Sequence, residues 1–353
     1  MRIHVEKLAV GDILISDTFN VLGLNVISKG TLLNVEDIQK LNNHNIEYVE
    51  ISPRYIEQTQ QTESIATTFH EEQALAFTNA IEGIKSLFDI AALEGLIQDE
   101  EVQAAFNPLI NSFQHENDVV SLLLSLNSKD DYTYQHSVQV GMLSYYIAKW
   151  LGKSDQESLK IGKAGYLHDI GKCKIDSVIL KKPGRLDDAE FAEIKRHTIY
   201  GYEIIDQSFH DHALSMATLQ HHERLDGRGY PMGKKNEDIH AYAKIVAVAD
   251  VYSAMICRRV YQEKRDMLIV LKELYRMSFG ELDPEAAHVF IKHMIPNFIG
   301  KQVILSDGRS GTIIMTNPND FFKPLVQIDN QFFDLSYRSG VEIISVDMQA
   351  FIK

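Results

Sequence analysis

The feature that most constrains the fold is a series of helical stripes between about Asp131 and Pro296 that carry histidine and aspartate among apolar residues. From Tyr132 to Leu151 the apolar positions recur every three or four residues, which predicts a helix with one buried face. His136 lies on that face. Asp250 has the same kind of position in a second stripe, with Ala243, Val246, Ala254 and Cys257. Buried groups of this kind are unfavourable unless they are paired or bind a metal, so the pattern predicts a site inside a helical domain.

A third helix brings a histidine and an aspartate to its last turn. We expect it to start at a capping box opened by Ser154, and its buried stripe ends at His168 and Asp169. Gly171 is expected to end this helix in the left-handed conformation. Lys172 follows directly.

Two further helices are predicted to bring histidines to the same region. Asp187 opens a helix that carries His197 at its far end. A helix from about Ala213 has His221 on its buried stripe, with His222 beside it. Each histidine alone would usually be a hydrogen-bonded core residue. Together, five imidazoles and two carboxylates predict a centre for a pair of first-row divalent ions, and this ligand set does not choose among Fe, Mn, Zn, Co and Ni. The candidate metal ligands are His136, His168, Asp169, His197, His221, His222 and Asp250.

Composition excludes several classes of partner and compartment. The chain is 45% hydrophobic and 24% charged, as in globular proteins, and its net charge of -14 argues against binding to duplex nucleic acid or anionic membranes. It has no apolar run of about 18 residues and no signal-peptide core at its start. Cys173 and Cys257 form no CxxC pair. We therefore expect a cytoplasmic protein without a membrane segment.

The 353 residues predict several domains in a mainly α chain. We expect a small α/β module at 1–60, a linker and amphipathic helices at 61–117, an all-helical catalytic domain at 118–298 and a small β-rich, SH3-like module at 299–353. The polar stretch 53–67 is expected to be the linker. The amphipathic helices, roughly 70–94, 99–113 and 118–126, would pack against the catalytic core or a second copy in a homodimer. The N-terminal module is expected to be a packing or sensory appendage rather than a catalytic one. The C-terminal module could bind a partner or cap the core, and we expect it to cap the core.

Several separated motifs in this order resemble the HD-GYP domain, a subgroup of the HD metal-dependent phosphohydrolases. They are HDIGK at 168–172, KPGRL at 182–186, His197, HHERLDGRGYP at 221–231 and ADVYSA at 249–254. The resemblance covers roughly residues 120–295. It implies an all-helical HD-type core and hydrolysis of cyclic di-GMP to linear pGpG, and sometimes on to GMP.

The resemblance also assigns the metal ligands. One ion would take His136, His168, Asp169 and Asp250, and the other would take His197, His221 and His222, with Asp169 bridging both. Two such ions would lower the pKa of a water, and the resulting hydroxide would attack phosphorus. Tyr132 occupies the place of a glutamate found in members with three metals, so we expect two ions and pGpG as the main product.

Substrate contacts are predicted from the same motifs. Lys172 would contact a nonbridging phosphate oxygen and, with Asp169, is assigned to catalysis. Arg185, Arg228 and Arg259 are further candidates for the phosphate. Tyr230 and Pro231, in the GYP stretch, would shape the mouth of the site or a surface for diguanylate-cyclase (GGDEF) or other signalling partners. Ser253, Arg258, Gln262 and Asp176 depart from the family pattern, which bears on substrate affinity rather than on metal binding.

Two alternatives to a cyclic di-GMP phosphodiesterase stay open. The first is a weakly active or inactive module that senses a cyclic dinucleotide or recruits partners. The presence of all seven ligands and Lys172 argues against it. The second is a phosphohydrolase of the HD type that acts on another nucleotide. The GYP stretch and the doublet of His221 and His222 favour the cyclic dinucleotide.

Overall fold

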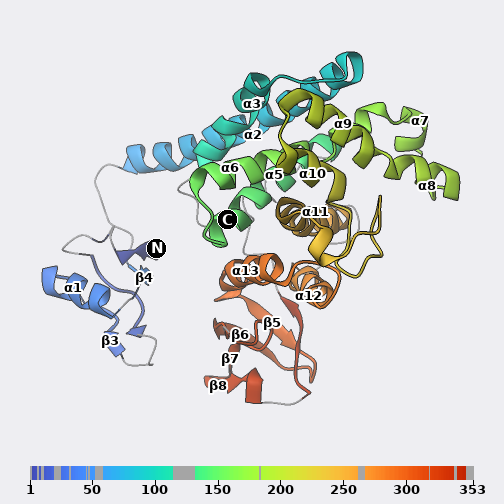
Figure 1. Ribbon diagram of the computed structural model, residues 1–353. Helices are drawn as coiled ribbons and strands as arrows, with labels where there is room; N and C mark the ends of the chain where they lie inside the picture. The colour runs from blue at the N-terminus through green and yellow to red at the C-terminus, as the bar shows by residue number, and fades with distance from the viewer. Residues whose placement is uncertain are drawn as a thin grey trace. The chain divides into compact units, whose positions relative to one another are not determined.

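A computed structural model of the chain describes residues 2–5, 8, 12–19, 25–31, 33–44, 46, 48–51, 59–113, 132–182, 184–260, 267–317, 319–337 and 340–346. Side chains are described throughout these ranges except at 2, 25, 35, 36, 43, 59–71 and 257–260. The chain forms two compact units, Met1–Phe69 and His70–Lys353 (Figure 1). The finer division into four parts stays a prediction. In the described part of the chain, no helix combines the length and the apolarity that crossing a membrane would need.

The first unit is the small α/β module that the sequence predicts. Strands β1 (Arg2–His4) and β4 (Tyr48–Glu50) pair antiparallel, as do β2 (Thr18–Phe19) and β3 (Asn25–Ile27). Helix α1 (Val35–Asn43) begins at a capping box formed by Asn34 and Asp37. The module has its own core, formed by Ile3, Val5, Leu14, Ile27, Leu33, Leu41, Val49 and Ile51.

Helix α2 runs from Thr59 to Glu94, so the stretch predicted as a linker, 53–67, is helical from Thr59 onward. No glycine or proline follows Pro53 in that stretch, and nothing in it ends a helix. The part of α2 in the second unit packs on the helical core, where Tyr166 Oη donates a hydrogen bond to the carbonyl of Ala80. The expected packing against the core is therefore confirmed for this stripe. The predicted helix 118–126 lies outside the described residues.

The second unit has the all-helical core that the sequence predicts. Its long helices enclose one buried apolar cluster, in which α5 packs against α6 and α11, and α10 packs against α9 and α11 (Figure 1). Described in chain order after α2, the helical elements are α3 (Asp99–Phe113), α5 (Tyr132–Trp150), α6 (Asp155–Leu167), η2 (Ile170–Lys174), α7 (Ser177–Leu180), α8 (Asp188–Lys195), α9 (His197–Phe209), α10 (His212–Gln220), η3 (Asn236–Asp238), α11 (Ala241–Val260), α12 (Met267–Met277), α13 (Pro284–Met294) and η4 (Ile295–Phe298).

Side-chain caps explain where several of these helices begin. Ser154 accepts a hydrogen bond from the backbone of Glu157 at the start of α6. Asp187 and Glu190 form a full capping box at the start of α8. Asp211 caps α10 by accepting from two backbone N–H groups. Because each cap satisfies N–H groups that a helix leaves free, it determines where the turns, and so the histidines at the far ends, lie.

The chain ends in a small antiparallel sheet, as the alternating pattern after Gly300 predicts. Its strands lie in the order β8-β7-β6-β5-β9. Val303, Ile313, Val326 and Val346 on its inner face belong to the same apolar cluster as the helices. The strands are β5 (Gln302–Leu305), β6 (Ser310–Met315), β7 (Leu325–Ile328), β8 (Gln331–Asp334) and β9 (Ile343–Val346), with η5 (Leu335–Tyr337) between the last two.

Candidate metal centre

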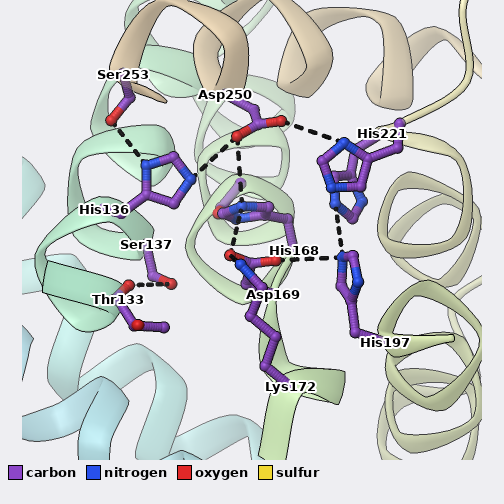
Figure 2. A network of polar contacts seen from close by, with 12 residues as sticks. Thr133, His136, Ser137, His168, Asp169, Lys172, His197, His221, Asp250 and Ser253 are labelled. Carbon is purple, nitrogen blue, oxygen red and sulfur yellow. Dashed lines mark hydrogen bonds and ion pairs between the residues drawn. The ribbon is translucent and has the colours of Figure 1, made fainter. Parts of the chain in front are cut away.

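The seven predicted ligands come together where three helix ends meet two helix interiors (Figure 2). His168 is the residue at which α6 ends, and His221 has the same place at the end of α10. His197 follows the end of α8 and is the first residue of α9. His136 and Asp250 project from within α5 and α11. The convergence that the helical stripes predict is therefore present in the fold.

A close crossing of two backbones brings Asp169 to His197. A Cβ atom on Gly171 would lie 2.0 Å from the carbonyl oxygen of His197 and 2.4 Å from the nitrogen of Gly201. The expectation that Gly171 ends α6 in the left-handed conformation is wrong, because Gly171 lies within η2 and α6 ends three residues earlier. Glycine is needed here because η2 packs directly on the first turn of α9.

The donor atoms form two adjacent groups. The first contains His136, His168 and Asp250, and the second contains Asp169, His197, His221 and His222; within each group the donor atoms lie within 4.8 Å of one another. Asp169 faces both groups, with Oδ2 3.3 Å from Nε2 of His168 and Oδ1 3.3 Å from Nε2 of His197. Asp250 also links them, since its two oxygens lie 3.0 Å from Nε2 of His136 and 3.5 Å from Nδ1 of His222.

Three of the histidines are oriented by backbone carbonyls. Nδ1 of His168, His197 and His221 each lies 2.7 to 2.8 Å from the carbonyl oxygen three residues earlier in the chain. A carbonyl can only accept, so Nδ1 carries the hydrogen and Nε2 of each ring is directed into the site. This is the orientation that a metal-binding imidazole requires.

Burial disfavours the charged form of both carboxyl groups, but neighbouring side chains that favour the charged form outweigh the effect of burial. Burial alone would raise the pKa of Asp169, but His168 and Lys172 hold the pKa of this carboxyl well below its ordinary value. The pKa of Asp250 is likewise held low against burial, chiefly by the hydrogen bond from His136. Both groups are therefore carboxylates at neutral pH, the form that binds cations.

The imidazoles divide into two classes of protonation behaviour. Burial lowers the pKa of His197 to about 4 and holds the pKa of His221 and His222 well below the ordinary value. Burial acts on His168 in the same direction, but the carboxylates of Asp169 and Asp250 outweigh it and raise the pKa of that ring. Three neutral rings next to two carboxylates are suited to bind a cation.

The polar atoms of the site fit a metal ion better than they fit one another. Nε2 of His197 and Nε2 of His221 lie 3.4 Å apart, and because both rings carry their hydrogen on Nδ1, two lone pairs face each other. Nε2 of His168 and Oδ1 of Asp169 are buried and make no hydrogen bond within the described residues. Buried acceptors arranged in this way are satisfied by a cation placed between them. The site could hold metal, and its nitrogen and oxygen donors suit first-row ions.

The predicted substrate-contacting residues lie at different distances from this centre. Lys172 forms an ion pair with Oδ2 of Asp169. The ring of Tyr230 lies over His222, with centroids 4.6 Å apart, so it forms one wall of the site. Arg185 is exposed, and Arg228 is exposed and pairs with Asp226; within the described contacts neither reaches the seven ligands. The side chains of Arg258, Arg259 and Gln262 lie outside the described residues. All of these assignments stay predictions.

Tyr132 lies beside the first group of ligands. Its ring stacks on that of His136, with centroids 6.0 Å apart and planes 10° from parallel. The side chain is 42% exposed, so it lies at the edge of the buried ligand groups.

The loop after His222 is held by a carboxylate that the sequence analysis did not single out. Glu223 is buried, and its two oxygens accept hydrogen bonds from the backbone N–H groups of Met232 and Lys234, at 2.7 and 2.9 Å. Gly229 passes so close to this segment of the backbone that a Cβ there would lie 2.4 Å from the Cα of Glu223. The sequence carried one indication, since a loop with glycines at 227, 229 and 233 leaves backbone N–H groups for a nearby carboxylate to satisfy.

Two further polar residues also escaped the sequence analysis. Ser253 was noted only as a departure from a family pattern, yet its hydroxyl contacts Nδ1 of His136 (Figure 2). The ammonium of Lys195 lies over the rings of Phe191 and Tyr230, 4.5 and 5.5 Å from their centroids. Neither position has a local sequence feature that marks it, because Ser253 and His136, like Lys195 and Tyr230, lie far apart in the sequence.

Comparison with known proteins agrees with this geometry. Residues 120–286 match the family described as HD domain. The cyclic di-GMP phosphodiesterase PA4108 of Pseudomonas aeruginosa is 33% identical over 272 residues, which are 76% of this chain and 64% of that protein. The cyclic di-GMP phosphodiesterase of Thermotoga maritima is 37% identical over 186 residues, 51% of this chain and 50% of that protein. The chain thus spans between half and about two thirds of the length of these relatives.

Further similarities extend the comparison to another cyclic dinucleotide and to a solved structure. The 3'3'-cGAMP-specific phosphodiesterase 3 of Vibrio cholerae is 32% identical over 160 residues, 45% of this chain and 35% of that protein. The structure of Bd1817, an HD-GYP-type protein from Bdellovibrio bacteriovorus, has the same fold with a TM-score of 0.51 and 17% identity, over 82% of this chain and 97% of that one. The HD-domain match contains both the HDIGK and the GYP motifs, so residues 120–286 form an HD domain of the HD-GYP type.

Proposed function

We propose that this protein is a metal-dependent phosphodiesterase that hydrolyses cyclic di-GMP to linear pGpG. The single observation that carries the proposal is the arrangement of five imidazoles and two carboxylates, all able to bind metal, in two adjoining groups. The names of the relatives from Pseudomonas and Thermotoga support the substrate.

Two divalent ions are proposed as the cofactors. His136, His168 and Asp250 would hold one, and His197, His221 and His222 the other, with Asp169 between them because its two oxygens face the two groups. When bound, a pair of divalent ions supplies a water of lowered pKa and neutralises phosphate oxygens. Seven protein donors for two ions leave positions open for water and substrate.

The remaining roles belong to side chains at the edge of the centre. Lys172 is the cation next to Asp169, and its ammonium would neutralise one phosphate oxygen. The Tyr230 ring over His222 is an apolar surface on which a purine base could stack. Depressed pKa values keep His197, His221 and His222 neutral, so their lone pairs are available without the loss of a proton.

The decisive experiment compares metal-free and metal-loaded protein. We expect protein prepared without air and loaded with Fe or Mn to convert cyclic di-GMP to pGpG, with no turnover after chelation. Replacement of His168 or Asp169 by alanine should abolish turnover while the helical circular dichroism stays unchanged. Full activity in either variant would overturn the assignment of the site. Metal-loaded protein that binds the dinucleotide without cleaving it would favour a sensor or recruiting module instead.

A second candidate substrate is 3'3'-cGAMP. It is favoured by the similarity to the cGAMP-specific phosphodiesterase of Vibrio cholerae. Initial rates on cyclic di-GMP, 3'3'-cGAMP and a mononucleotide, measured with the same metal-loaded sample, would separate the two readings. A higher kcat/KM on cGAMP would replace cyclic di-GMP as the proposed substrate.

A further inference from the structure

His136 is held differently from the other helix-borne histidines of the site. His168, His197 and His221 lie at helix ends, where the carbonyl groups of the last turn lack the N–H partner that a continuing helix would supply four residues later, and they accept Nδ1–H. His136 lies inside α5, where the carbonyl groups of the preceding turn are already used by the helix itself. Its Nδ1 atom therefore needs an acceptor from another element.

That acceptor is the hydroxyl of Ser253 on α11. Nδ1 of His136 lies 3.0 Å from Ser253 Oγ, and Ser253 Oγ lies 2.9 Å from Oε1 of Gln139. All three residues are buried, with 5%, 1% and 3% of their surfaces exposed. Water has little access to these three hydrogen-bonded side chains, so their polar atoms have to form hydrogen bonds with one another.

The direction of the hydrogen bonds follows from counting protons. A serine hydroxyl has one hydrogen, and here it is donated to Oε1 of Gln139. Only lone pairs of Ser253 Oγ then remain to face His136, so Nδ1 of His136 must carry a hydrogen and donate it. Nε2 of His136 lies 3.0 Å from Oδ1 of Asp250 and faces the first group of ligands. Because Nδ1–H is committed to Ser253, Nε2 is the nitrogen that would give its lone pair to an ion.

We infer that Ser253 and Gln139 form a relay that holds His136 in its metal-binding tautomer and so determines the metal affinity of the group of His136, His168 and Asp250. This inference rests on the proposed function, because it requires that ions occupy the site. The second group does not depend on the relay, since His197 and His221 are oriented by backbone carbonyls. The relay therefore acts on one ion of the pair, and Ser253 and Gln139 are positioning residues rather than ligands.

The test is a metal titration of full-length protein. Metal-free wild type and Ser253→Ala would be titrated with Zn²⁺ in competition with a chelating dye, which yields an affinity for each of two ions. We expect Ser253→Ala to bind one ion about 10- to 100-fold more weakly, as is typical when the outer partner of a metal-bound histidine is lost, and the other ion with unchanged affinity. Ser253→Thr, which retains the hydroxyl, should restore the weakened site, and Gln139→Leu should weaken the same ion.

Ser158→Ala is the matched control. Ser158 is fully buried in α6, and its Oγ has no hydrogen-bond partner within the described residues, so the same atom is removed without touching the relay. The inference would be overturned if Ser253→Ala bound both ions with wild-type affinity, or if its affinity fell equally for both ions. If wild type binds two ions and Ser253→Ala loses one, but neither hydrolyses a cyclic dinucleotide, the relay stands and the proposed function fails. Wild type that binds no ion would overturn both.

Discussion

The carboxylate of Glu223 offers a quantitative test of how the GYP loop is held over the site. It is 2% exposed, and each of its oxygens accepts one backbone N–H from the loop, from Met232 and from Lys234. No ion pair within the described residues involves Glu223, so these two hydrogen bonds are what the carboxylate contributes. Because Tyr230 lies in the same loop and covers His222, loosening the loop should uncover the candidate metal centre.

Glu223→Gln removes one of these bonds with almost no change in shape. An amide offers one oxygen and one NH2 group, so one loop N–H keeps its acceptor and the other faces a donor. A hydrogen bond to a charged group contributes about 1.5–3 kcal/mol, so the loop should open about ten to a hundred times more often. Glu237→Gln is the control, because Glu237 is exposed on the following turn and holds no loop N–H among the described contacts.

Hydrogen exchange measured by mass spectrometry would detect the opening. In Glu223→Gln we expect peptides that contain residues 224–235 to exchange faster by that factor, while peptides from α10 and α11 keep their wild-type rates. The metal content should stay unchanged and KM for the dinucleotide should rise, because Tyr230 no longer forms a fixed wall. Exchange at the wild-type rate in the loop, or an equal acceleration throughout the domain, would refute the account of Glu223 as a local clamp.

Three further changes test other parts of the centre. Gly171→Ala would place a Cβ 2.0 Å from the carbonyl oxygen of His197, and overpacking against backbone should cost about 3 kcal/mol or more in urea unfolding; wild-type stability would contradict the crossing. Lys172→Ala should reduce kcat by a larger factor than it reduces the metal content measured by elemental analysis. An equal reduction of both would indicate that the lysine is structural. In metal-free protein, the pKa of His197 is about 4 in the folded state against 6.5 in the unfolded state. This difference contributes about 3 kcal/mol to the free energy of unfolding above pH 6.5, and the contribution is lost as the pH falls toward 4. Between pH 6.5 and 4, the free energy of unfolding measured with urea should therefore fall less in His197→Gln than in wild type. An equal fall in both proteins would contradict the expected effect of His197.

Helical periodicity was sufficient to predict which candidate ligands lie on buried faces inside helices. His136 and Asp250 were predicted from apolar residues at helical spacing, and both are buried on α5 and α11. This pattern is reliable in a long buried helix because nearly every neighbouring position must be apolar. The five ligands at helix ends were harder to place, since a shift of one residue at a helix end turns a side chain by about 100°. Their convergence was predicted from the helix caps and the spacing of the motifs together.

Predictions failed where a residue's role depends on another element. Gly171 was assigned to a helix end from its type, although its actual requirement is the nearby backbone of His197 and Gly201. Glu223 was passed over because the N–H groups it binds lie nine and eleven residues later in the chain. The polar stretch from Thr59 was assigned to a linker from its composition, but composition alone does not end a helix in the absence of glycine or proline.

The two ways of holding a histidine imply two different sensitivities to mutation. At a helix end, the carbonyl that orients the ring belongs to the backbone, so no side-chain replacement can remove it, and only a change that moves the backbone can disturb His168, His197 or His221. Within a helix, the orienting group has to be a side chain, so the loss of a single hydroxyl at Ser253 is enough to release His136. The orientation of His197 and His221 should therefore tolerate changes in the surrounding side chains that the orientation of His136 does not. Because Asp169 faces both groups, a mutation that empties the first would still leave the second with a complete set of donors.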